Sequence, residues 1–509
     1  MAEHGVTVET TSGTLLGGAH RGTVVFRGIP YAAPPVGRLR FRPPQPVDGW
    51  TGVREALAFG PMAPQNPSAL EAIAGNTPLG QSEDCLTLNV WTPGCDDAKR
   101  PVMVWIHGGG FTTGTAASPW YSGTNTALQG DVVVVTVNYR LGALGFTHLA
   151  DLGGEAWGSS ANCGILDQVA ALAWVRENIA AFGGDPGNVT IYGESAGGCS
   201  VVTLLATPSA KGLFHKAIAQ SASCGQVRTR EAAGERAEVL LAELGVDATR
   251  LDRLAEMPLE QILEAQARLS TRRNRAGFSG ADMQAFSPAP DGTSLREMPL
   301  DAIAAGSAAD IPVIVGTNRD EIKLFAVWDV ALQSLDREGA IARLRGVARD
   351  RAPQLFDAYA ATRPGEPASE VAMAIASDET FRLAAVQMAE AQHAVGKPAY
   401  LYLFTWPSPA LGGGLGACHA LEIPFVFDNV HQPGVELLTG NGAERAPLAK
   451  VMNAAWTAFA RTGSPDHAGM PVWPGYDPAS RSTMVFDDKV ELVDDPLGSD
   501  RLAWSEAMA

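Results

Sequence analysis

The pentapeptide Gly193-Glu-Ser-Ala-Gly197 places one serine between two glycines. A β-like run, Asn188–Tyr192, comes directly before it, and a short apolar helical pattern, Cys199–Ala206, follows. A strand, a tight turn and a helix in this order are typical of a nucleophile elbow, in which larger side chains two residues either side of the serine would collide. The helix N-terminus behind the turn favours developing negative charge. The pattern therefore predicts that Ser195 is a nucleophile.

Serine is a poor nucleophile at its own pKa, so it needs a base, usually a histidine held by a carboxylate. Behind such an elbow the chain order is serine, acid, histidine, which leaves only histidines well beyond Ser195. His419 fits best, because it lies in a loop after the strand candidate Ala399–Trp406, and His431 stays open. The others are disfavoured by their positions: His215 is too near the serine, His393 lies in a helical pattern, and His467 lies in a terminal turn.

The acid should follow a strand. The run Ile311–Gly316 is such a strand candidate, and two adjacent carboxylates, Asp320 and Glu321, come shortly after it. Spacing alone leaves both open.

A second glycine-rich segment follows its own strand candidate, Pro101–Ile106, and reads His107-Gly108-Gly109-Gly110. Backbone without side chains can approach a substrate closely and direct N–H groups at one oxygen. In lipases and esterases this HGGG element acts together with the N–H of the residue after the nucleophile, here Ala196. The two elements together predict acyl-transfer chemistry.

The elements that must position these residues alternate between strands and helices. The Val-rich run Asp131–Tyr139 has the composition of a strand buried on both faces, and Asp167–Phe182 has the periodicity of a helix. This alternation predicts an α/β fold with a central, mostly parallel sheet flanked by helices. Helical insertions are expected at about 228–300 and 330–396, within one catalytic domain spanning residues 1–509.

Composition excludes several classes of protein. The 509 residues include 38 Lys and Arg against 55 Asp and Glu, a net charge of −17, with 46% hydrophobic residues. Such a chain can bury a large core, and its acidity argues against binding nucleic acid. The strongest apolar run, Val132–Val137, is too short to span a membrane, and the first residues show no signal peptide, so a cytoplasmic location is expected. No metal or cofactor motif is present, and the six cysteines are expected to be free thiols.

Many ordered motifs make the chain resemble the type-B carboxylesterase/cholinesterase family of the α/β-hydrolase fold, and in particular its bacterial p-nitrobenzyl-esterase-like members. The motifs run almost from end to end. They are Phe26–Gly37, Ser82–Asn89, His107–Phe111, Asn138–Arg140, Phe182–Pro186, Gly193–Gly198, Gly316–Glu321, His419–Phe425 and Trp473–Tyr476.

The resemblance implies a role for residues that spacing leaves undecided. It assigns the acid to Glu321 and the base to His419. The oxyanion donors are then Gly109, Gly110 and Ala196, and two further carboxylates, Glu194 and Glu422, are expected near the site. It also implies a structural ion pair between Glu83 and Arg140.

Two departures from the family pattern bear on specificity. No cysteine precedes Cys85, so a disulfide of the vertebrate members is missing. The tryptophan with which cholinesterases hold choline corresponds to Gly75 here, and the nearest tryptophans are Trp50 and Trp91. We therefore expect no specialisation for choline esters.

The resulting hypothesis is a carboxylesterase that cleaves small carboxylic esters through an acyl-enzyme, with no cofactor and with a small ester as its substrate. Two alternatives stay open. The same machinery could cleave carbamates or amides, or the scaffold could serve as a non-catalytic binding protein. The sequence does not determine the substrate, nor whether the protein is a monomer or a homodimer.

Overall fold

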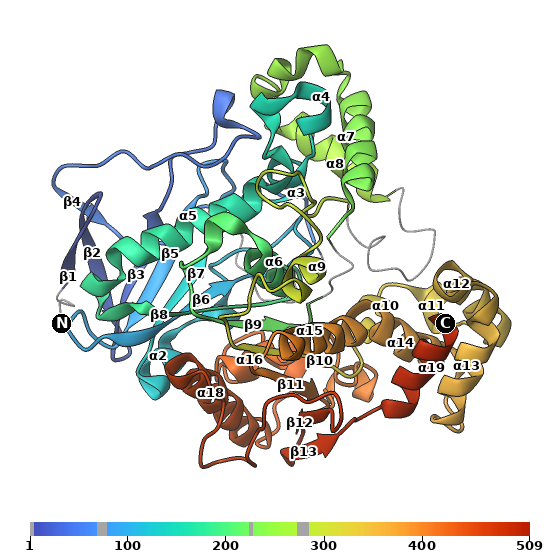
Figure 1. Ribbon diagram of the computed structural model, residues 1–509. Coiled ribbons are helices and arrows are strands. Elements are labelled where there is room, and N and C mark those ends of the chain that lie inside the picture. The colour runs from blue at the N-terminus through green and yellow to red at the C-terminus, as the bar shows by residue number, and fades with distance from the viewer. Residues whose placement is uncertain (1–4, 69–78, 223–226, 272–284, 509) are drawn as a thin grey trace.

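The computed structural model describes residues 5–68, 79–222, 227–271 and 285–508, and its centre is one large twisted sheet (Figure 1). In these residues the sheet has 13 strands in the order β1-β2-β3-β5-β7-β6-β8-β9-β10-β11-β12-β13, with β4 beside β2. All neighbouring pairs from β7 to β12 are parallel, and the pairs toward both edges are antiparallel except that of β4 with β2, which is parallel. The strands are β1 Val6–Thr10, β2 Gly13–His20, β3 Thr23–Pro30, β4 Val53–Glu55, β5 Thr87–Thr92, β6 Arg100–Ile106, β7 Val133–Val137, β8 Gly184–Glu194, β9 Lys216–Gln220, β10 Val313–Asn318, β11 Ala399–Phe404, β12 Ser482–Phe486 and β13 Glu491–Asp494.

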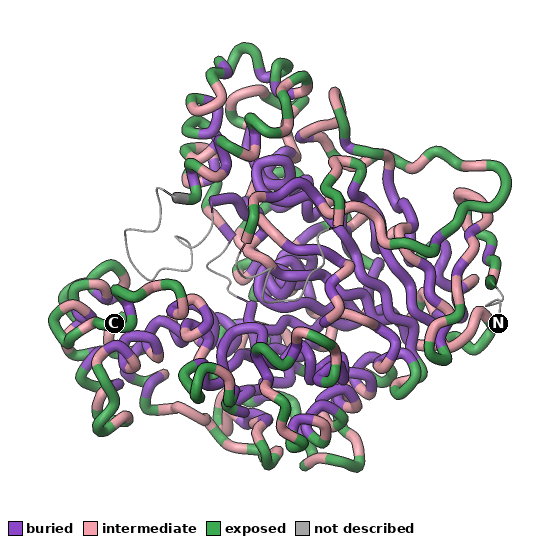
Figure 2. Tube along the Cα trace, turned by 180° about the vertical axis from the view of Figure 1, so that it is seen from behind, coloured by how far each residue is buried: buried purple, intermediate pink, exposed green. Residues whose placement is uncertain are grey.

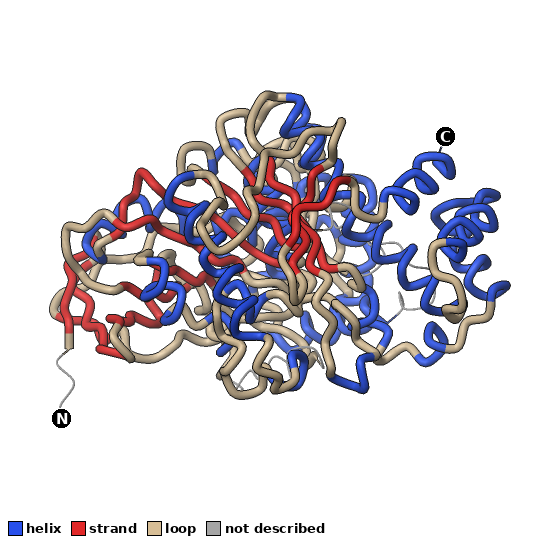
Figure 3. The backbone as a smooth tube through the Cα atoms, turned by 90° about the horizontal axis from the view of Figure 1, so that it is seen from below, coloured by secondary structure: helices blue, strands red, loops and turns tan. Residues whose placement is uncertain are grey.

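Helices cover both faces of the sheet (Figures 1 and 3). Helices α5, α6 and α15 pack on one face, and α2, α16 and α18 pack on the other. The helices are α2 Thr124–Gly130, α3 Gly142–Phe146, α4 Ala150–Gly153, α5 Cys163–Asn178, α6 Ala196–Ala206, α7 Arg230–Leu244, α8 Leu259–Thr271, α9 Pro299–Ala304, α10 Ile322–Ala326, α11 Val330–Gln333, α12 Arg337–Ala348, α13 Ala352–Ala361, α14 Ala368–Ser377, α15 Leu383–Ala394, α16 Ile423–Val426, α17 Glu436–Thr439, α18 Arg445–Thr462 and α19 Gly498–Met508.

The central strands are buried on both faces, which explains their continuous apolar sequences (Figure 2). Strand β6 shows the alternation clearly. Val104 and Ile106 join the core under α5 and α6, whereas Met103 and Trp105 join the core on the opposite face. The fold class predicted from the sequence, a mostly parallel sheet flanked by helices, is confirmed.

Strand β9, Lys216–Gln220, has no counterpart among the predicted strands. Its sequence, Lys-Ala-Ile-Ala-Gln, is short and holds two alanines, which have low β propensity. It forms because β8 and β10 pair with it in parallel on either side. Tertiary pairing therefore overrides a weak local preference.

The predicted helical insertions lie where helices α7, α8 and α9 and helices α11 to α15 are found. Helices α11 to α14 pack with α10 and α19 around a small core of their own, whereas α15 packs on the sheet (Figure 1). Between α14 and α15 the chain makes a π-helical turn, Asp378–Arg382. Residues 272–284 of the first insertion lie outside the described residues, and the single-domain organisation stays a prediction.

The expected ion pair between Glu83 and Arg140 is wrong. Glu83 pairs with Arg40 at 2.5 Å, and Arg140 pairs with Asp167 of α5 at 2.6 Å. The fully buried Asp167 carboxylate also accepts the backbone N–H and Nε–H of Arg140. An acid on a neighbouring helix thus satisfies this arginine, and its position could not be deduced from local spacing.

Among the described residues, no helix has both the length and the apolar character that a membrane crossing requires. The five described cysteines are free thiols, as predicted. Cys224 and Gly75, on which two further expectations rest, lie outside the described residues.

Candidate active site

Ser195 lies between the end of β8 and the start of α6, as the elbow pattern predicts. Its backbone has φ +58° and ψ −122°, a conformation that residues other than glycine rarely adopt. Two hydrogen bonds hold this conformation. The N–H of Ser195 donates to the Gln220 carbonyl at 3.0 Å, and its carbonyl accepts from the N–H of Cys199 at 2.8 Å.

The positions two residues before and after the serine must be glycine, because β6 lies too close to leave room for a side chain there. A Cβ atom added at Gly197 would lie 2.0 Å from the carbonyl oxygen of Ile106, and one added at Gly193 would lie 2.6 Å from the same atom. Both distances are far below any real contact, so β6 can approach the turn only because these two residues have no side chain.

His419 and Glu321 form the core of the site. The Nδ1 atom of His419 lies 2.5 Å from Glu321 Oε2, and both side chains are buried. The other Glu321 oxygen, Oε1, accepts the N–H of Asn318 at 2.8 Å. This carboxylate is therefore held at one oxygen by backbone and contacts the imidazole with the other.

The hydrogen bonds of the described residues do not include one between Ser195 Oγ and His419 Nε2. The Nε2 atom instead lies 3.0 Å from Glu194 Oε1, one residue before the serine. A Cβ added at Gly108 would lie 3.1 Å from Glu194 Oε2 and 3.2 Å from Ser195 Cβ. Gly108 of the HGGG segment therefore lies against the same turn whose glutamate faces the imidazole.

Two aromatic rings lie against the imidazole of His419. The sequence did not predict either of them. Phe325 of α10 lies 5.1 Å from it and Phe381 of the π-helical turn lies 4.8 Å from it, measured between ring centroids. Both rings pack against the base, which is only 2% exposed. Phe325, four residues after Glu321, could have been suspected as the next-turn neighbour of the acid on a helix. No local signal marked Phe381.

Glu422 lies behind the acid and binds to the ends of two strands. Its Oε1 accepts from Gln220 Nε2 at 3.1 Å, and its Oε2 accepts from Asn318 Nδ2 at 2.6 Å. Gln220 and Asn318 also bond through their backbones to Ser195 and Glu321, respectively. The structure places both Glu194 and Glu422 in the cluster around His419, and Gln220 and Asn318 are residues of this cluster that sequence reasoning missed.

Three buried carboxylates, Glu194, Glu321 and Glu422, therefore lie around one histidine, and the pKa values of His419, Glu194 and Glu422 are shifted. Burial alone would lower the pKa of His419, but Glu194 and Glu321 outweigh it and raise that pKa to about 9. Burial raises the pKa of Glu194 well above its ordinary value, with a further increase from Glu422 and Glu321 that the charge of His419 opposes. Burial likewise raises the pKa of Glu422, although the hydrogen bonds from Asn318 and Gln220 oppose the shift.

The HGGG segment follows β6 directly and has the left-handed backbone that its glycines allow. Gly109 has φ +107° and Gly110 has φ +62°. His107, at the start of the segment, is buried, and burial lowers its pKa to about 4. It is therefore neutral at physiological pH, and its ring stacks on Tyr139 at 4.5 Å.

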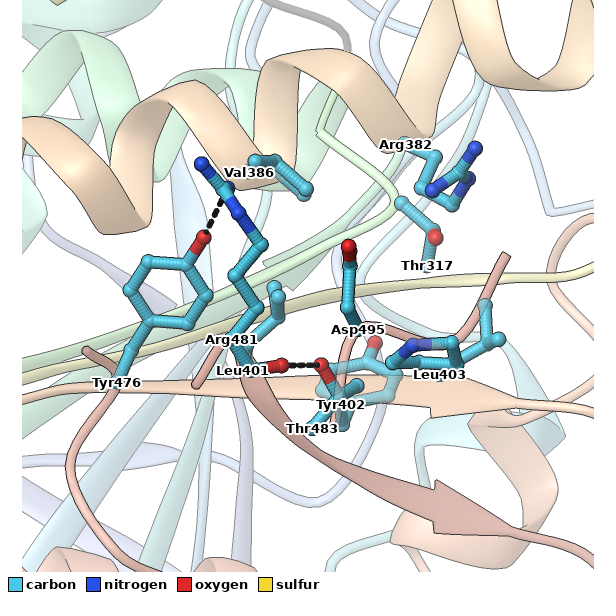
Figure 4. A pocket seen from close by; sticks show the side chains of 12 residues that line it. Thr317, Arg382, Val386, Leu401, Tyr402, Leu403, Tyr476, Arg481, Thr483 and Asp495 are labelled. Carbon is cyan, nitrogen blue, oxygen red and sulfur yellow. Dashed lines mark hydrogen bonds between the residues drawn. The ribbon is translucent and has the colours of Figure 1, made fainter. Parts of the chain in front are cut away.

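Away from this cluster, a small pocket of about 20 Å³ lies beneath α15 and is lined by residues of the strands and of the C-terminal segment (Figure 4). Its two arginines already have partners. Arg382 binds Asp378 through Nε at 2.6 Å, and Arg481 donates to the hydroxyl of Tyr476 at 2.7 Å. A cavity of this size holds about one water molecule. This pocket is therefore too small to hold an ester substrate. Among the described residues, no group of three or more His, Cys, Asp or Glu side chains is arranged to hold a metal ion.

Comparison with known proteins identifies the fold and the enzyme class. A family model described as the carboxylesterase family matches residues 4–504. The chain belongs to the carboxylesterase family. The para-nitrobenzyl esterase of Bacillus subtilis (strain 168) is 41% identical over 494 residues, covering 96% of each chain. The phenmedipham hydrolase of Pseudarthrobacter oxydans is 38% identical over 489 residues, covering 94% of each chain.

Solved structures agree with this assignment to the carboxylesterase family. The Geobacillus stearothermophilus carboxylesterase EST55 superimposes with a TM-score of 0.88 at 42% identity, covering 98% of this chain and 99% of that one. A PNB esterase structure gives a TM-score of 0.87 at 40% identity with the same coverage. The fold is therefore the α/β-hydrolase fold, and the protein is a carboxylic ester hydrolase. This confirms the family and enzyme class expected from the sequence.

Proposed function

We propose that this carboxylesterase hydrolyses small esters through a Ser195–His419–Glu321 triad and an acyl-enzyme intermediate. The observation that carries the proposal is the buried contact of 2.5 Å between His419 Nδ1 and Glu321 Oε2, next to a serine held in a strained turn. In the reaction, Ser195 Oγ attacks the ester carbonyl while His419 takes its proton. Glu321 orients the imidazole and stabilises the imidazolium that forms.

The negative charge that develops on the carbonyl oxygen needs donors fixed in advance. We assign these donors to the N–H groups of Gly109, Gly110 and Ala196. Ala196 is the first residue of α6, so its N–H lies at the positive end of an 11-residue helix. The alcohol then leaves with the proton from His419, and water repeats the sequence on the acyl-enzyme.

The proposed triad includes a hydrogen bond from Ser195 Oγ to His419 Nε2 during the reaction. Catalytic hydrogen bonds are often loose without substrate and tighten in the complex. We propose that the serine side chain turns toward the imidazole, which faces the neighbouring Glu194, when substrate binds. We assign positioning roles near the triad to Glu194 and Glu422. The cytoplasmic location, and carbamate or amide cleavage as an alternative to ester cleavage, stay predictions.

The test is Ser195→Ala, assayed with p-nitrophenyl butyrate and with a fluorophosphonate probe. We expect kcat to fall by about 10⁶ and labelling to disappear, because the residual rate comes from binding and the oxyanion donors alone. The matched control is Ser200→Ala, since Ser200 is also buried, lies on α6 and, within the described part of the chain, has its hydroxyl bonded to Gln168 Nε2. Retention of one tenth of the activity by Ser195→Ala would exclude this nucleophile.

A further inference from the structure

The oxyanion loop, defined as residues 107–114, contains glycine at four of its eight positions. Glycine loses more conformational freedom on ordering than any other residue. A loop of this composition holds its N–H groups in one direction only if other parts of the protein fix it. The hydrogen bonds to the loop therefore show what determines its shape.

The first half of the loop is tied to its own backbone and to the segment after β7. The carbonyl of Gly109 accepts the N–H groups of Thr112 and Thr113 at 3.1 and 2.9 Å. The hydroxyl of Tyr139 donates to the carbonyl of His107 at 2.7 Å. The N–H of Gly142 donates to the carbonyl of Phe111 at 2.6 Å. These bonds leave the closing residue, Gly114, to be held from elsewhere.

Gly114 is held by the side chain of Gln65, which lies 49 residues away in the sequence. Oε1 of Gln65 accepts the N–H of Gly114 at 2.9 Å, and Nε2 of Gln65 donates to the carbonyl of Gly114 at 2.9 Å. One amide side chain thus binds both backbone groups of one residue, as a neighbouring strand would. Gln65 is only 5% exposed, so water competes little for these bonds.

Gly114 in turn lies directly against the start of the loop. It has φ +115°, and an added Cβ would lie 2.4 Å from His107 Nδ1 and 2.5 Å from the Gly108 carbonyl oxygen. A shift of Gly114 would therefore be transmitted to His107 and Gly108, and Gly108 lies against Ser195. Gln65 contacts none of the reacting groups that we assign, but it holds the residue that supports them.

Gln65 is itself anchored firmly enough to hold another segment. Its N–H donates to Gln81 Oε1 at 3.0 Å, and its Nε2 also donates to the carbonyl of Ala63 at 3.0 Å. Three residues earlier, the carbonyl of Met62 accepts the N–H of Ser82 at 3.1 Å. The segment that carries Gln65 is thus fixed to the segment that leads into β5.

We propose that Gln65 is a positioning residue for ester hydrolysis, because its side-chain amide fixes the oxyanion loop through Gly114. The inference rests on the proposed function, since it assumes that Gly109 and Gly110 donate to the oxyanion. Donors fixed before the reaction need no reorganisation as charge develops, whereas a loosened loop would have to be ordered in each turnover. The effect therefore concerns the transition state more than substrate binding.

The experiment compares Gln65→Met, which removes both hydrogen bonds at similar side-chain size, with wild type. The control is Gln45→Met, because Gln45 is exposed and, among the described residues, its side chain donates to the carbonyls of Pro43 and Pro44 alone. We expect kcat for p-nitrophenyl butyrate to fall by about 10–100-fold, somewhat less than the loss of one oxyanion donor. KM and the inhibition constant of p-nitrophenol should change by less than about twofold, as expected for an interaction that acts in the transition state.

The decisive readout is an aryl trifluoromethyl ketone, whose adduct with the serine places an oxyanion in the hole. Its affinity should fall by the same factor as kcat in Gln65→Met and stay unchanged in Gln45→Met, since transition-state analogues report such interactions. Circular dichroism and thermal melting establish that the variants are folded. If Gln65→Met does not fold, Gln65→Glu replaces it, since it keeps the acceptor for the Gly114 N–H and loses the donor, and it should show a partial loss.

The outcomes separate the two proposals. Equal kcat and equal ketone affinity for wild type and Gln65→Met would overturn the role of Gln65. A parallel loss of ketone and p-nitrophenol binding would also overturn it, because that pattern indicates general disruption of the site. If wild type bound the trifluoromethyl ketone no better than the corresponding methyl ketone, the proposed function itself would fail.

Discussion

Asp320 and Glu321 are adjacent carboxylates with different surroundings. Glu321 is buried and contacts His419 Nδ1. Asp320 accepts the N–H of Ala417 at 2.9 Å and pairs with Arg319 and Lys323. The first arrangement can orient a base, and the second anchors the loop that leads to that base.

We expect Glu321→Gln to lower kcat by about 10³–10⁴, because an amide in place of the carboxylate favours the wrong imidazole tautomer and removes the charge that stabilises the imidazolium. Asp320→Asn should lower kcat by less than about tenfold, since it keeps the hydrogen-bonding shape. Steady-state kinetics of the two purified variants measure the difference. The opposite order of effects would assign the acid to Asp320.

The pKa of His419 predicts the pH dependence of the reaction. A general base must be neutral, and a histidine with a pKa of about 9 is mostly protonated at pH 7. The neutral fraction rises about tenfold per pH unit below that pKa, so kcat/KM should rise from pH 6 toward pH 9.

Glu194→Gln should shift this rising limb to lower pH, because it removes a carboxylate 3.0 Å from Nε2 that favours the protonated imidazole. The control is Glu260→Gln, at an exposed position of α8. The pH profile of kcat/KM is the measurement. A limb that stays in place or moves to higher pH would show that Glu194 does not set the pKa of the base.

At the scale of elements, the site depends on how closely β6, β8 and α6 approach one another. The strained serine is tolerated because β8 and β9 hold the turn from one side through the Gln220 carbonyl. Gly193 and Gly197 allow the carbonyl of Ile106 to reach the turn from the other side. Strain at a functional residue persists only when its surroundings determine it in this way.

Gly197→Ala tests this contact. Its Cβ would lie 2.0 Å from a backbone oxygen that cannot rotate away, so β6 and the turn must separate. We expect a loss of about 1–3 kcal/mol in the free energy of unfolding, as for overpacking, together with a large fall in kcat. Chemical denaturation and kinetics measure both quantities.

Gly234→Ala is the control for glycine replacement, because its Cβ would meet nothing within 4 Å on helix α7. It should raise the free energy of unfolding by up to about 1 kcal/mol, the helix propensity difference, and leave kcat unchanged. Normal stability and activity in Gly197→Ala would show that the close packing at the elbow is not required.

The π-helical turn Asp378–Arg382 is a local irregularity that brings a side chain to the candidate site. It joins α14 and α15 and places Phe381 against the ring of His419. A buried ion pair between Asp378 and Arg382 spans the turn. Such turns insert one residue into a helix and often occur at functional sites. Here the insertion lets a helix on the sheet face direct one aromatic ring to the base.

At the scale of the whole molecule, parallel strands bring distant segments to one edge of the sheet. Ser195 follows β8, Glu321 follows β10, and His419 follows β11, so the same edge collects all three. Because β9 lies between β8 and β10, its last residue, Gln220, lies among them. The carboxyl ends of parallel strands are where α/β folds collect such residues.

The sequence by itself determined those features that depend on neighbours along the chain. The glycine spacing around Ser195 required a tight turn, and the three glycines after His107 required a loop without side chains. The alternation of Val-rich runs with helical periodicity required a layered α/β fold. Each conclusion follows from backbone sterics or from hydrophobic period, which act over a few residues.

Only the tertiary structure decided which distant groups meet. The choice of Glu321 as the contact of His419, the pairing of Arg140 with Asp167 and the bonds between Gln65 and Gly114 join segments 27 to 98 residues apart. Hydrogen bonds and ion pairs act over a few ångströms, and nothing in local spacing encodes which strand or loop will come within that range. Packing of the whole sheet sets these contacts, and for that reason spacing alone left the acid undecided, and the partner that the family resemblance implied for Arg140 was wrong.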